Sequence, residues 1–216
     1  MTKILSLNVG KPRTAVYGDR EVVTGIFKSP VPGPLLLRRL NLDGDCQADL
    51  SVHGGRNKAV YAYPSEHYAF WREQFPEQEL PWGMFGENFT TEGLLEESAY
   101  IGDQFRIGGA IVKVTQPRMP CFKLGIRFGR PDMVKRFLAS RRSGIYFSVI
   151  EEGMVNVSDA IERIEQNENC VSIADVNRAY TDTKHNLPLV RRIVELEILP
   201  SGLHEEFAEE LALLEQ

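Results

Sequence analysis

Short runs of apolar and β-branched residues recur through the first two-thirds of the chain, and glycine or proline separates them. The runs fall at 4–9, 20–27, 35–40, 59–63, 104–107, 111–115 and 146–150. Such runs, bounded by turn residues, are typical of β-strands. No regular alternation with helices accompanies them, so the pattern predicts an antiparallel barrel or sandwich rather than a parallel α/β sheet.

Two segments within this region have helical spacing instead. Ser65 precedes a run with aromatic residues on one face, and Pro76 ends it, which predicts a helix over 65–75. Pro131 suits the first turn of a second helix over 131–142. The aromatic residues of both segments are most simply interpreted as core.

The pattern becomes helical after about residue 167. Ser172 and Asp175 have nearly the spacing of a capping box, and Pro188 marks another helix start. A third helical run, 202–214, ends the chain. These signals predict a β domain over 1–165 and a small three-helix domain over 166–216. Three such helices can resemble a helix-turn-helix, but the acidic last helix argues against DNA binding.

Charge and cysteine content narrow the class of protein. The net charge of −5 argues against nucleic-acid binding, whereas residues 113–142 carry nine Lys or Arg and one acid. This basic segment suits a small anionic ligand, although a solvated basic helix explains the outer charges equally well. Three widely spaced cysteines fit neither a disulfide framework nor a zinc site and favour a cytoplasmic location. No apolar stretch has the length of a membrane span.

The segment QPRMPCFKL holds the strongest candidate for chemistry, Cys121. Two prolines stiffen its approach, and Arg118 and Lys123 flank it. Positive charge favours a thiolate, which serves as a nucleophile or a metal ligand. The alternative is an inert, buried cysteine that behaves as a small hydrophobe.

Two other polar segments are weaker candidates. His53 lies in the motif HGG, whose glycines allow close approach of a ligand, but a lone histidine is more often structural. Asn88 lies in the loop FGENFTTEGL, where a turn that bonds its own backbone is the simpler interpretation.

The ordered run of segments resembles MOSC-domain proteins of the YiiM type. The resemblance rests on GIFKSPVPGPLLLRRLNLDGDCQADLSVHGGRNKAVYAYPSEHYAFW, on FGENFTTEGLLEESAYIGDQFRIGGAIVKVTQPRMPCFKL and on the helical tail. The family name marks kinship with the C-terminal domain of molybdenum cofactor sulfurase. The resemblance implies a MOSC-type β-barrel followed by a small C-terminal three-helix domain.

The resemblance also implies a function, namely molybdenum-cofactor-dependent reduction of N-hydroxylated compounds such as 6-hydroxylaminopurine. Oxygen is removed from an N–OH group and the amine is released. Cys121 matches the family cysteine and is the expected molybdenum ligand and catalytic residue. The expected cofactor contacts are Lys28, Ser29, His53, Asn88, Arg118 and Lys123, of which His53 could equally be structural.

The chain has neither a clustered-cysteine iron–sulfur pattern nor a dinucleotide-binding fingerprint, so electrons are expected from a separate reductase. Whether the protein forms a homodimer stays open. One alternative is a non-catalytic carrier of sulfur or of the molybdenum cofactor that uses the same thiol. A second is cysteine-based acyl or thiol chemistry, which requires a base near the thiol, such as His53.

Overall fold

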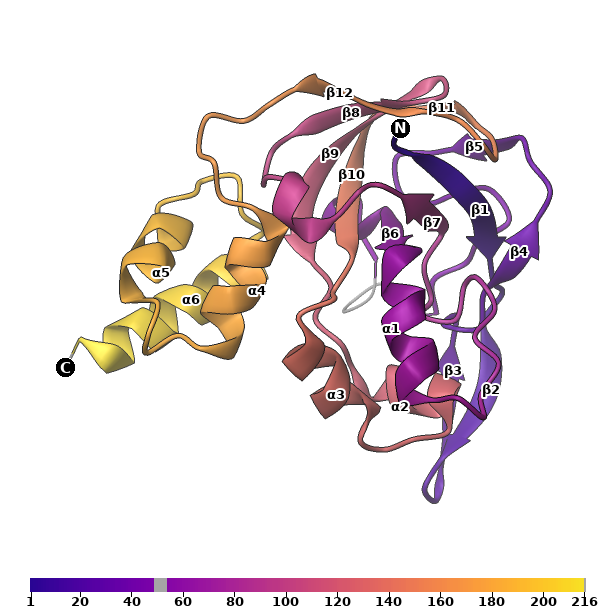
Figure 1. The fold of residues 1–216 in the computed structure, drawn as a ribbon, viewed down its shortest axis with the longest axis horizontal. Helices are drawn as coiled ribbons and strands as arrows, with labels where there is room; N and C mark the ends of the chain where they lie inside the picture. Colours follow the sequence, from indigo (N-terminus) through magenta and orange to yellow (C-terminus); the bar gives the residue numbers. More distant parts are fainter. Residues whose placement is uncertain (49–53, 216) are drawn as a thin grey trace.

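The computed structural model describes residues 1–48 and 54–215, and its main element is an eight-stranded sheet (Figure 1). In sheet order the strands are β12 (Ile161–Glu165), β8 (Gln104–Ile107), β9 (Ala110–Pro117), β10 (Ile145–Glu151), β6 (Val60–Pro64), β7 (Phe89–Glu92), β1 (Lys3–Val9) and β4 (Ser29–Val31). Neighbours are antiparallel except β6 and β7, which are parallel. Two small antiparallel pairs complete the strands: β2 (Arg13–Tyr17) with β3 (Arg20–Thr24), and β5 (Leu35–Leu37) with β11 (Gly153–Val155).

The sheet is not closed into a barrel, so the expected barrel is wrong in this respect. β12 and β4 are its two edges. β4 is a three-residue strand that contains Pro30, and it pairs with β1 only from Leu7 to Val9. The other half of β1 meets the segment before β12 through an isolated bridge, Lys3↔Ala160. The two edges therefore contact different halves of β1 and do not form a continuous ladder with each other.

Six α-helices in the described part of the chain accompany the sheet. α1 (Glu66–Gln74), α2 (Phe122–Phe128) and α3 (Met133–Ser140) interrupt the strands, and α4 (Ile173–Thr181), α5 (Leu187–Val194) and α6 (Ser201–Leu214) follow them. Single turns of 3₁₀-helix are η1 (Arg56–Lys58) and η2 (Glu96–Ser98). The helices α1 and α3 were expected from the sequence, whereas the seven-residue α2 was not. The three helices after residue 167 are confirmed.

β6 is buried on both faces and separates two apolar clusters. Val60 and Ala62 belong to the cluster inside the sheet, and Tyr61 and Tyr63 belong to a second cluster beneath α1–α3. This alternation follows from the two-residue period of a strand. The second cluster is rich in aromatic rings; Tyr63 and Phe85, for example, stack with centroids 4.3 Å apart.

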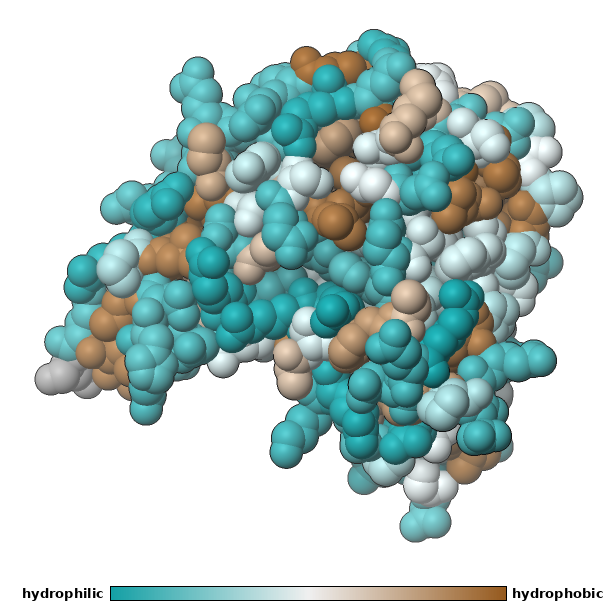
Figure 2. All heavy atoms as spheres, viewed as in Figure 1, coloured by the Kyte–Doolittle hydropathy of each residue, from teal (hydrophilic) through white to brown (hydrophobic). Residues whose placement is uncertain are grey.

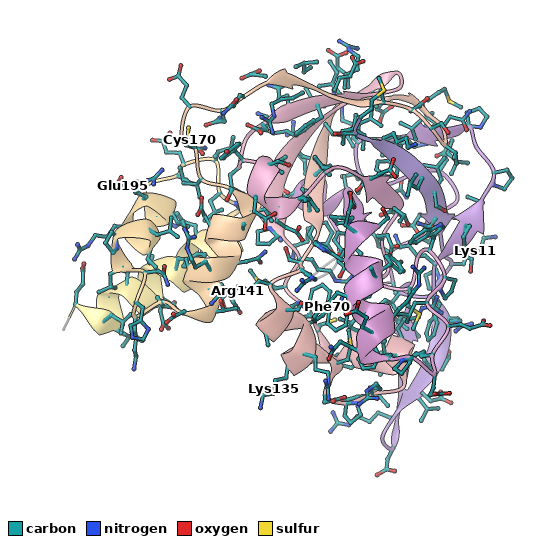
Figure 3. All side chains as sticks on the ribbon, viewed as in Figure 1. Lys11, Phe70, Lys135, Arg141, Cys170 and Glu195 are labelled. Atoms are coloured by element: carbon teal, nitrogen blue, oxygen red, sulfur yellow. The ribbon has the colours of Figure 1, made fainter. Side chains whose placement is uncertain are left out.

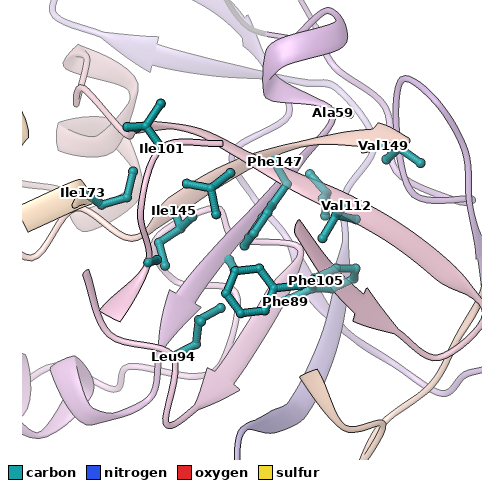
Figure 4. Close-up of a cluster of buried hydrophobic side chains, with 14 of the residues drawn as sticks. Ala59, Phe89, Leu94, Ile101, Phe105, Val112, Ile145, Phe147, Val149 and Ile173 are labelled. Carbon is teal, nitrogen blue, oxygen red and sulfur yellow. The ribbon is translucent and has the colours of Figure 1, made fainter. Parts of the chain in front are cut away.

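The core of the sheet continues into the C-terminal helices. Ile173 of α4 lies near Ile101 and Ile145 in the close-up of this cluster (Figure 4), and buried residues of α5 and α6 belong to the same cluster. In Figure 1 these helices form a group at one side of the sheet. The division into domains at residue 165 stays a prediction. The apolar cluster contains residues from both sides of that division.

The surface offers few extended apolar areas on the face in Figure 2, where hydrophobic residues appear as scattered patches among hydrophilic ones. No helix in the described part of the chain has the length and apolar character needed to cross a membrane. Cys46, Cys121 and Cys170 are all described and form no disulfide. Cys170 is exposed on the connection that leads to α4 (Figure 3).

Candidate functional site

A cavity of about 90 Å³ brings together four segments that are far apart in the sequence. They are the stretch after β3, the turn near Asp45, the loop before β7 and the segment between β9 and α2; the segment of Gly54 and Lys58, β6 and β10 add further lining residues. The cavity is lined by Thr24, Gly25, Ile26, Lys28, Asp45, Cys46, Gln47, Ala48, Gly54, Lys58, Tyr61, Gly86, Asn88, Arg118, Cys121, Lys123 and Tyr146. Four basic residues (Lys28, Lys58, Arg118 and Lys123) and two cysteines therefore line the same cavity.

Cys121 lies at this cavity as the residue immediately before α2. Its backbone is extended, and its side chain is partly exposed. Both Arg118 and Lys58 interact electrostatically with Cys121. The inert, fully buried cysteine considered as an alternative is therefore not what the structure contains.

Lys28 and Asp45 form a buried ion pair in the cavity wall. The Lys28 Nζ lies 2.6 Å from Asp45 Oδ2. The same oxygen accepts a hydrogen bond from Asn88 Nδ2 at 2.9 Å, and Asp45 Oδ1 accepts one from the Gly10 amide at 2.9 Å. Burial lowers the pKa of Lys28, and the attraction of Asp45 partly offsets that effect. Lys28 has three donor hydrogens, so this pair leaves it able to donate toward an anion.

Asn88 has mainly a clamping role in this geometry. Besides Asp45, its side chain accepts from the Tyr61 amide at 3.2 Å, and its backbone amide donates to the Tyr61 carbonyl at 2.8 Å. The simple self-bonded turn considered from the sequence is not observed. Asn88 instead joins β6 to the turn that carries Asp45.

Arg118 is buried between aromatic side chains and the loop before β7. Its guanidinium donates to the Phe85 carbonyl and lies 4.9 Å from the centroid of the Tyr61 ring. Tyr61 in turn donates its hydroxyl to the Ser143 carbonyl at 2.6 Å. These contacts hold a permanent positive charge at the cavity.

The loop before β7 owes its shape to Glu87, a fully buried carboxylate. Glu87 accepts hydrogen bonds from the Gly83 amide at 2.7 Å, the Phe85 amide at 3.0 Å and the Thr90 hydroxyl at 3.0 Å, and also from Tyr68. Burial raises the pKa of Glu87, although these hydrogen bonds oppose the rise. The carboxylate fixes the carbonyl of Phe85 that Arg118 contacts.

The other expected contacts have different outcomes. Lys123 is buried and lines the cavity with Lys28 and Arg118, as the charge pattern predicts. Ser29 is exposed at the start of β4 and is not among the lining residues, so its position offers no support for a cofactor contact. His53 lies outside the described residues.

Sequence reasoning missed three lining groups. Lys58 follows the HGG motif by only three residues, which is a usable signal, and burial lowers its pKa while Cys121 partly offsets the fall. Asp45 was not among the predicted site residues. Tyr146 was interpreted as an ordinary strand residue, and burial raises its pKa. Cys46 is exposed but also borders the cavity.

The side chains that line the cavity suit a metal whose other ligands are supplied by an organic cofactor. Among residues 1–48 and 54–215, no group of three or more His, Cys, Asp or Glu side chains is placed to hold a metal ion. Two free thiols border the cavity, and Cys121 is the one that interacts with the cations Lys58 and Arg118. Soft thiolate suits a soft metal centre, and the lysine and arginine side chains suit the anionic part of an organic cofactor. The residues present therefore fit a cysteine-bound metal cofactor.

Comparison with known sequences places the chain among MOSC-domain proteins. The model of the MOSC domain family matches residues 49–162. The chain is 43% identical over 205 residues to the uncharacterized protein YflK of Bacillus subtilis (strain 168), and the match covers 94% of this chain and 92% of YflK. It is 32% identical over 196 residues to a protein named Reductase from Gibberella moniliformis. That match covers 89% of this chain but 35% of the fungal protein.

A solved structure has the same fold. The crystal structure of YiiM from Geobacillus stearothermophilus is similar with a TM-score of 0.82 and 33% sequence identity. The match covers 98% of this chain and 100% of that chain, so the C-terminal helices are included.

Proposed function

Because this chain belongs to the MOSC-domain family and is of the YiiM type, we propose that it is an oxidoreductase that reduces N-hydroxylated compounds with a molybdenum cofactor bound through Cys121. The observation that carries the proposal is that Cys121 borders the same cavity as Lys28, Arg118 and Lys123. The reductase name of the fungal relative supports the reaction type. The substrate is an N-hydroxylated small molecule, such as 6-hydroxylaminopurine.

In this proposal the chain's residues divide the work of holding the cofactor. Cys121 supplies the thiolate ligand, and Arg118 and Lys123 neutralise anionic oxygens. Lys28 donates toward the same anions while Asp45 holds it in place. When bound, the cofactor supplies two-electron oxygen-atom transfer, and the protein orients the substrate and limits its access to water. Electrons come from a separate reductase.

The test is to produce the protein in a host that synthesises the molybdenum cofactor. Bound molybdenum and pterin are measured, and reduction of 6-hydroxylaminopurine to adenine is followed with a chemical electron donor. The proposal expects about one molybdenum per chain and turnover. Bound cofactor without turnover of any N-hydroxylated compound would instead favour the carrier alternative, which uses the same thiol.

A further inference from the structure

The hairpin of β2 and β3 extends beyond the eight-stranded sheet and contacts α2 (Figure 1). Near the turn of the hairpin, the ring of Tyr17 packs against the ring of Phe122, with centroids 5.1 Å apart. Both side chains stay exposed, at 41% and 39%. Phe122 directly follows Cys121 in the sequence. This exposed aromatic pair is therefore one residue away from the proposed metal ligand.

The face of the hairpin that carries Tyr17 also carries two arginines. Arg20 pairs directly with Tyr17 across the two strands, and Arg13 lies four residues before Tyr17 in β2. Because a strand has a two-residue period, all three side chains lie on one face, whereas Glu21 lies on the other and Asp19 lies in the turn. Among the described residues, neither Arg13 nor Arg20 has a partner in an ion pair.

A third cation, Arg127 of α2, lies close to Arg13. The guanidinium carbons of Arg13 and Arg127 lie 3.4 and 5.2 Å from the centroid of the same ring, that of Phe27. Arg127 donates one long hydrogen bond, of 3.4 Å, to the Lys28 carbonyl, and its Nε has no partner in the described chain. Burial and, as a smaller effect, the charge of Arg13 lower the pKa of Arg127. The chain thus gathers positive charge here, and an anionic partner offsets the repulsion.

The proposed reaction needs an entry point for electrons. Cleavage of the N–O bond of R–NHOH consumes two electrons and two protons and yields R–NH2 and water. The sequence has no iron–sulfur pattern and no dinucleotide-binding fingerprint, so the electrons come from another molecule. Exposed aromatic rings next to arginines are typical of protein interfaces, and an excess of one charge steers a partner of the opposite charge. The position beside Cys121 suits a partner that delivers electrons there.

We propose that the surface formed by Arg13, Tyr17, Arg20, Phe122 and Arg127, the hairpin–α2 surface, binds an acidic electron-carrier protein with a flavin or iron–sulfur centre. The carrier delivers one electron in each of two encounters and is oxidised each time, and solvent supplies the two protons. The arginines steer the encounter, and the aromatic pair contacts the carrier beside Cys121. The interface is small and transient, because the carrier leaves after each electron. This inference rests on the proposed function for the partner's role, but binding is measurable without turnover.

The test compares reduced flavodoxin, an acidic flavin protein, with reduced methyl viologen, a small donor that needs no docking surface. In low salt, kcat/KM for flavodoxin should fall about threefold in Arg13→Gln and about tenfold in Arg13→Glu, and salt should shrink both effects. Phe122→Ser should cost about tenfold at either salt concentration. Turnover with methyl viologen, bound molybdenum and the thermal melt should stay close to those of the wild type. Lys184→Glu, which reverses an exposed cation between α4 and α5, is the control and should change nothing.

Binding of oxidised flavodoxin to the molybdenum-loaded protein, measured by calorimetry, provides a readout without turnover and should weaken in the same order. If the wild type turns over with methyl viologen but does not bind flavodoxin, or if all variants bind and use it equally, the surface assignment is wrong while the proposed function stands. If the wild type reduces nothing with either donor, the proposed function fails, and flavodoxin binding alone decides the surface assignment. A dimer that Phe122→Ser dissociates in sedimentation would assign the surface to a second copy and overturn the inference.

Discussion

The ammonium group of Lys28 and the carboxylate of Asp45 form an ion pair 2.6 Å long inside the cavity that Cys121 borders. Both side chains are nearly inaccessible, at 10% and 2% exposure. Removal of one member of a buried pair leaves the other charge buried without a partner, which destabilises the fold. The pair therefore links the stability of the fold to the charge of the site.

The first prediction concerns this pair. Asp45→Ala should lower the free energy of unfolding by about 3–5 kcal/mol, because it leaves a buried ammonium group and the Asn88 amide without their acceptor. Urea unfolding measures the change. Adding Lys28→Met to Asp45→Ala should recover part of the loss. The matched control is Glu92→Ala, which removes the exposed pair with Lys3 and should cost about 1 kcal/mol or less. Equal losses for Asp45→Ala and Glu92→Ala would contradict the buried-pair interpretation.

The second prediction concerns Cys121. Cys121→Ser replaces a soft thiolate ligand with a hydroxyl of similar size and should abolish both bound molybdenum and substrate reduction. Its midpoint of thermal unfolding should stay close to that of the wild type, because the side chain is partly exposed. Metal analysis, turnover and a thermal melt are measured on each variant.

Cys170→Ser is the control for that experiment and should retain both properties, since Cys170 is exposed and is not among the residues lining the cavity. Cys46→Ser is a poorer control, because Cys46 borders the cavity. Full molybdenum content and full activity in Cys121→Ser would exclude the ligand assignment. Full molybdenum without activity would move Cys121 from holding the metal to tuning its reactivity.

The third prediction compares two serines at helix starts. The Ser172 hydroxyl accepts a hydrogen bond from the Asp175 amide at 3.0 Å, and the Asp175 carboxylate accepts one from the Ser172 amide at 3.0 Å, which completes a capping box for α4. Ser172→Ala should cost about 1 kcal/mol of unfolding free energy. Ser65 precedes α1 but forms no capping hydrogen bond, so Ser65→Ala should cost only a few tenths of that. Chemical denaturation of both variants decides the matter, and a larger loss for Ser65→Ala would refute the assignment of the caps.

The fourth prediction concerns pH. Hydrogen bonds from Arg130 and Arg136 lower the pKa of Asp132 to about 2 from an ordinary value of 3.8. The folded state therefore favours the carboxylate, so the stabilisation is fully present above about pH 4 and is lost as the pH falls through about 2. Asp132→Asn should lower the urea midpoint at pH 6 relative to the wild type, and the difference should shrink at pH 2.5. A difference that is the same at both pH values would show that charge is not its origin.

Several elements followed from the sequence alone because their signals are local. The runs of apolar residues at β1, β6, β8, β9 and β10 lie in strands as predicted. The capping box at Ser172 and the proline at the start of α5 are both observed. The caps depend on hydrogen bonds over three or four residues, and the strands show as apolar runs of similar length, so a short window of sequence contains both signals.

Other elements lack that local signal. β7 was interpreted as a polar loop, yet its Thr90 is fully buried and hydrogen-bonded to Asn8 and Glu87. β12 is almost entirely exposed and therefore shows no apolar alternation. α2 contains Gly125, whose position is set by close approach to the Arg130 carbonyl: a Cβ there would lie 2.9 Å from that oxygen. In each case contacts with other parts of the fold, rather than local propensity, determine the conformation of the segment.

For the candidate site, the sequence by itself identified Cys121, Arg118 and Lys123 as neighbours, because they lie within six residues of one another in a segment stiffened by two prolines. It could not determine that Asp45 neutralises Lys28 or that Lys58 interacts with the thiol of Cys121. It also could not determine whether the sheet closes, since that depends on which half of β1 each edge contacts. The physical reason is distance along the chain. Charges and strands far apart in sequence meet only after the core has packed, and only then do burial and low dielectric give their contacts a decisive energy.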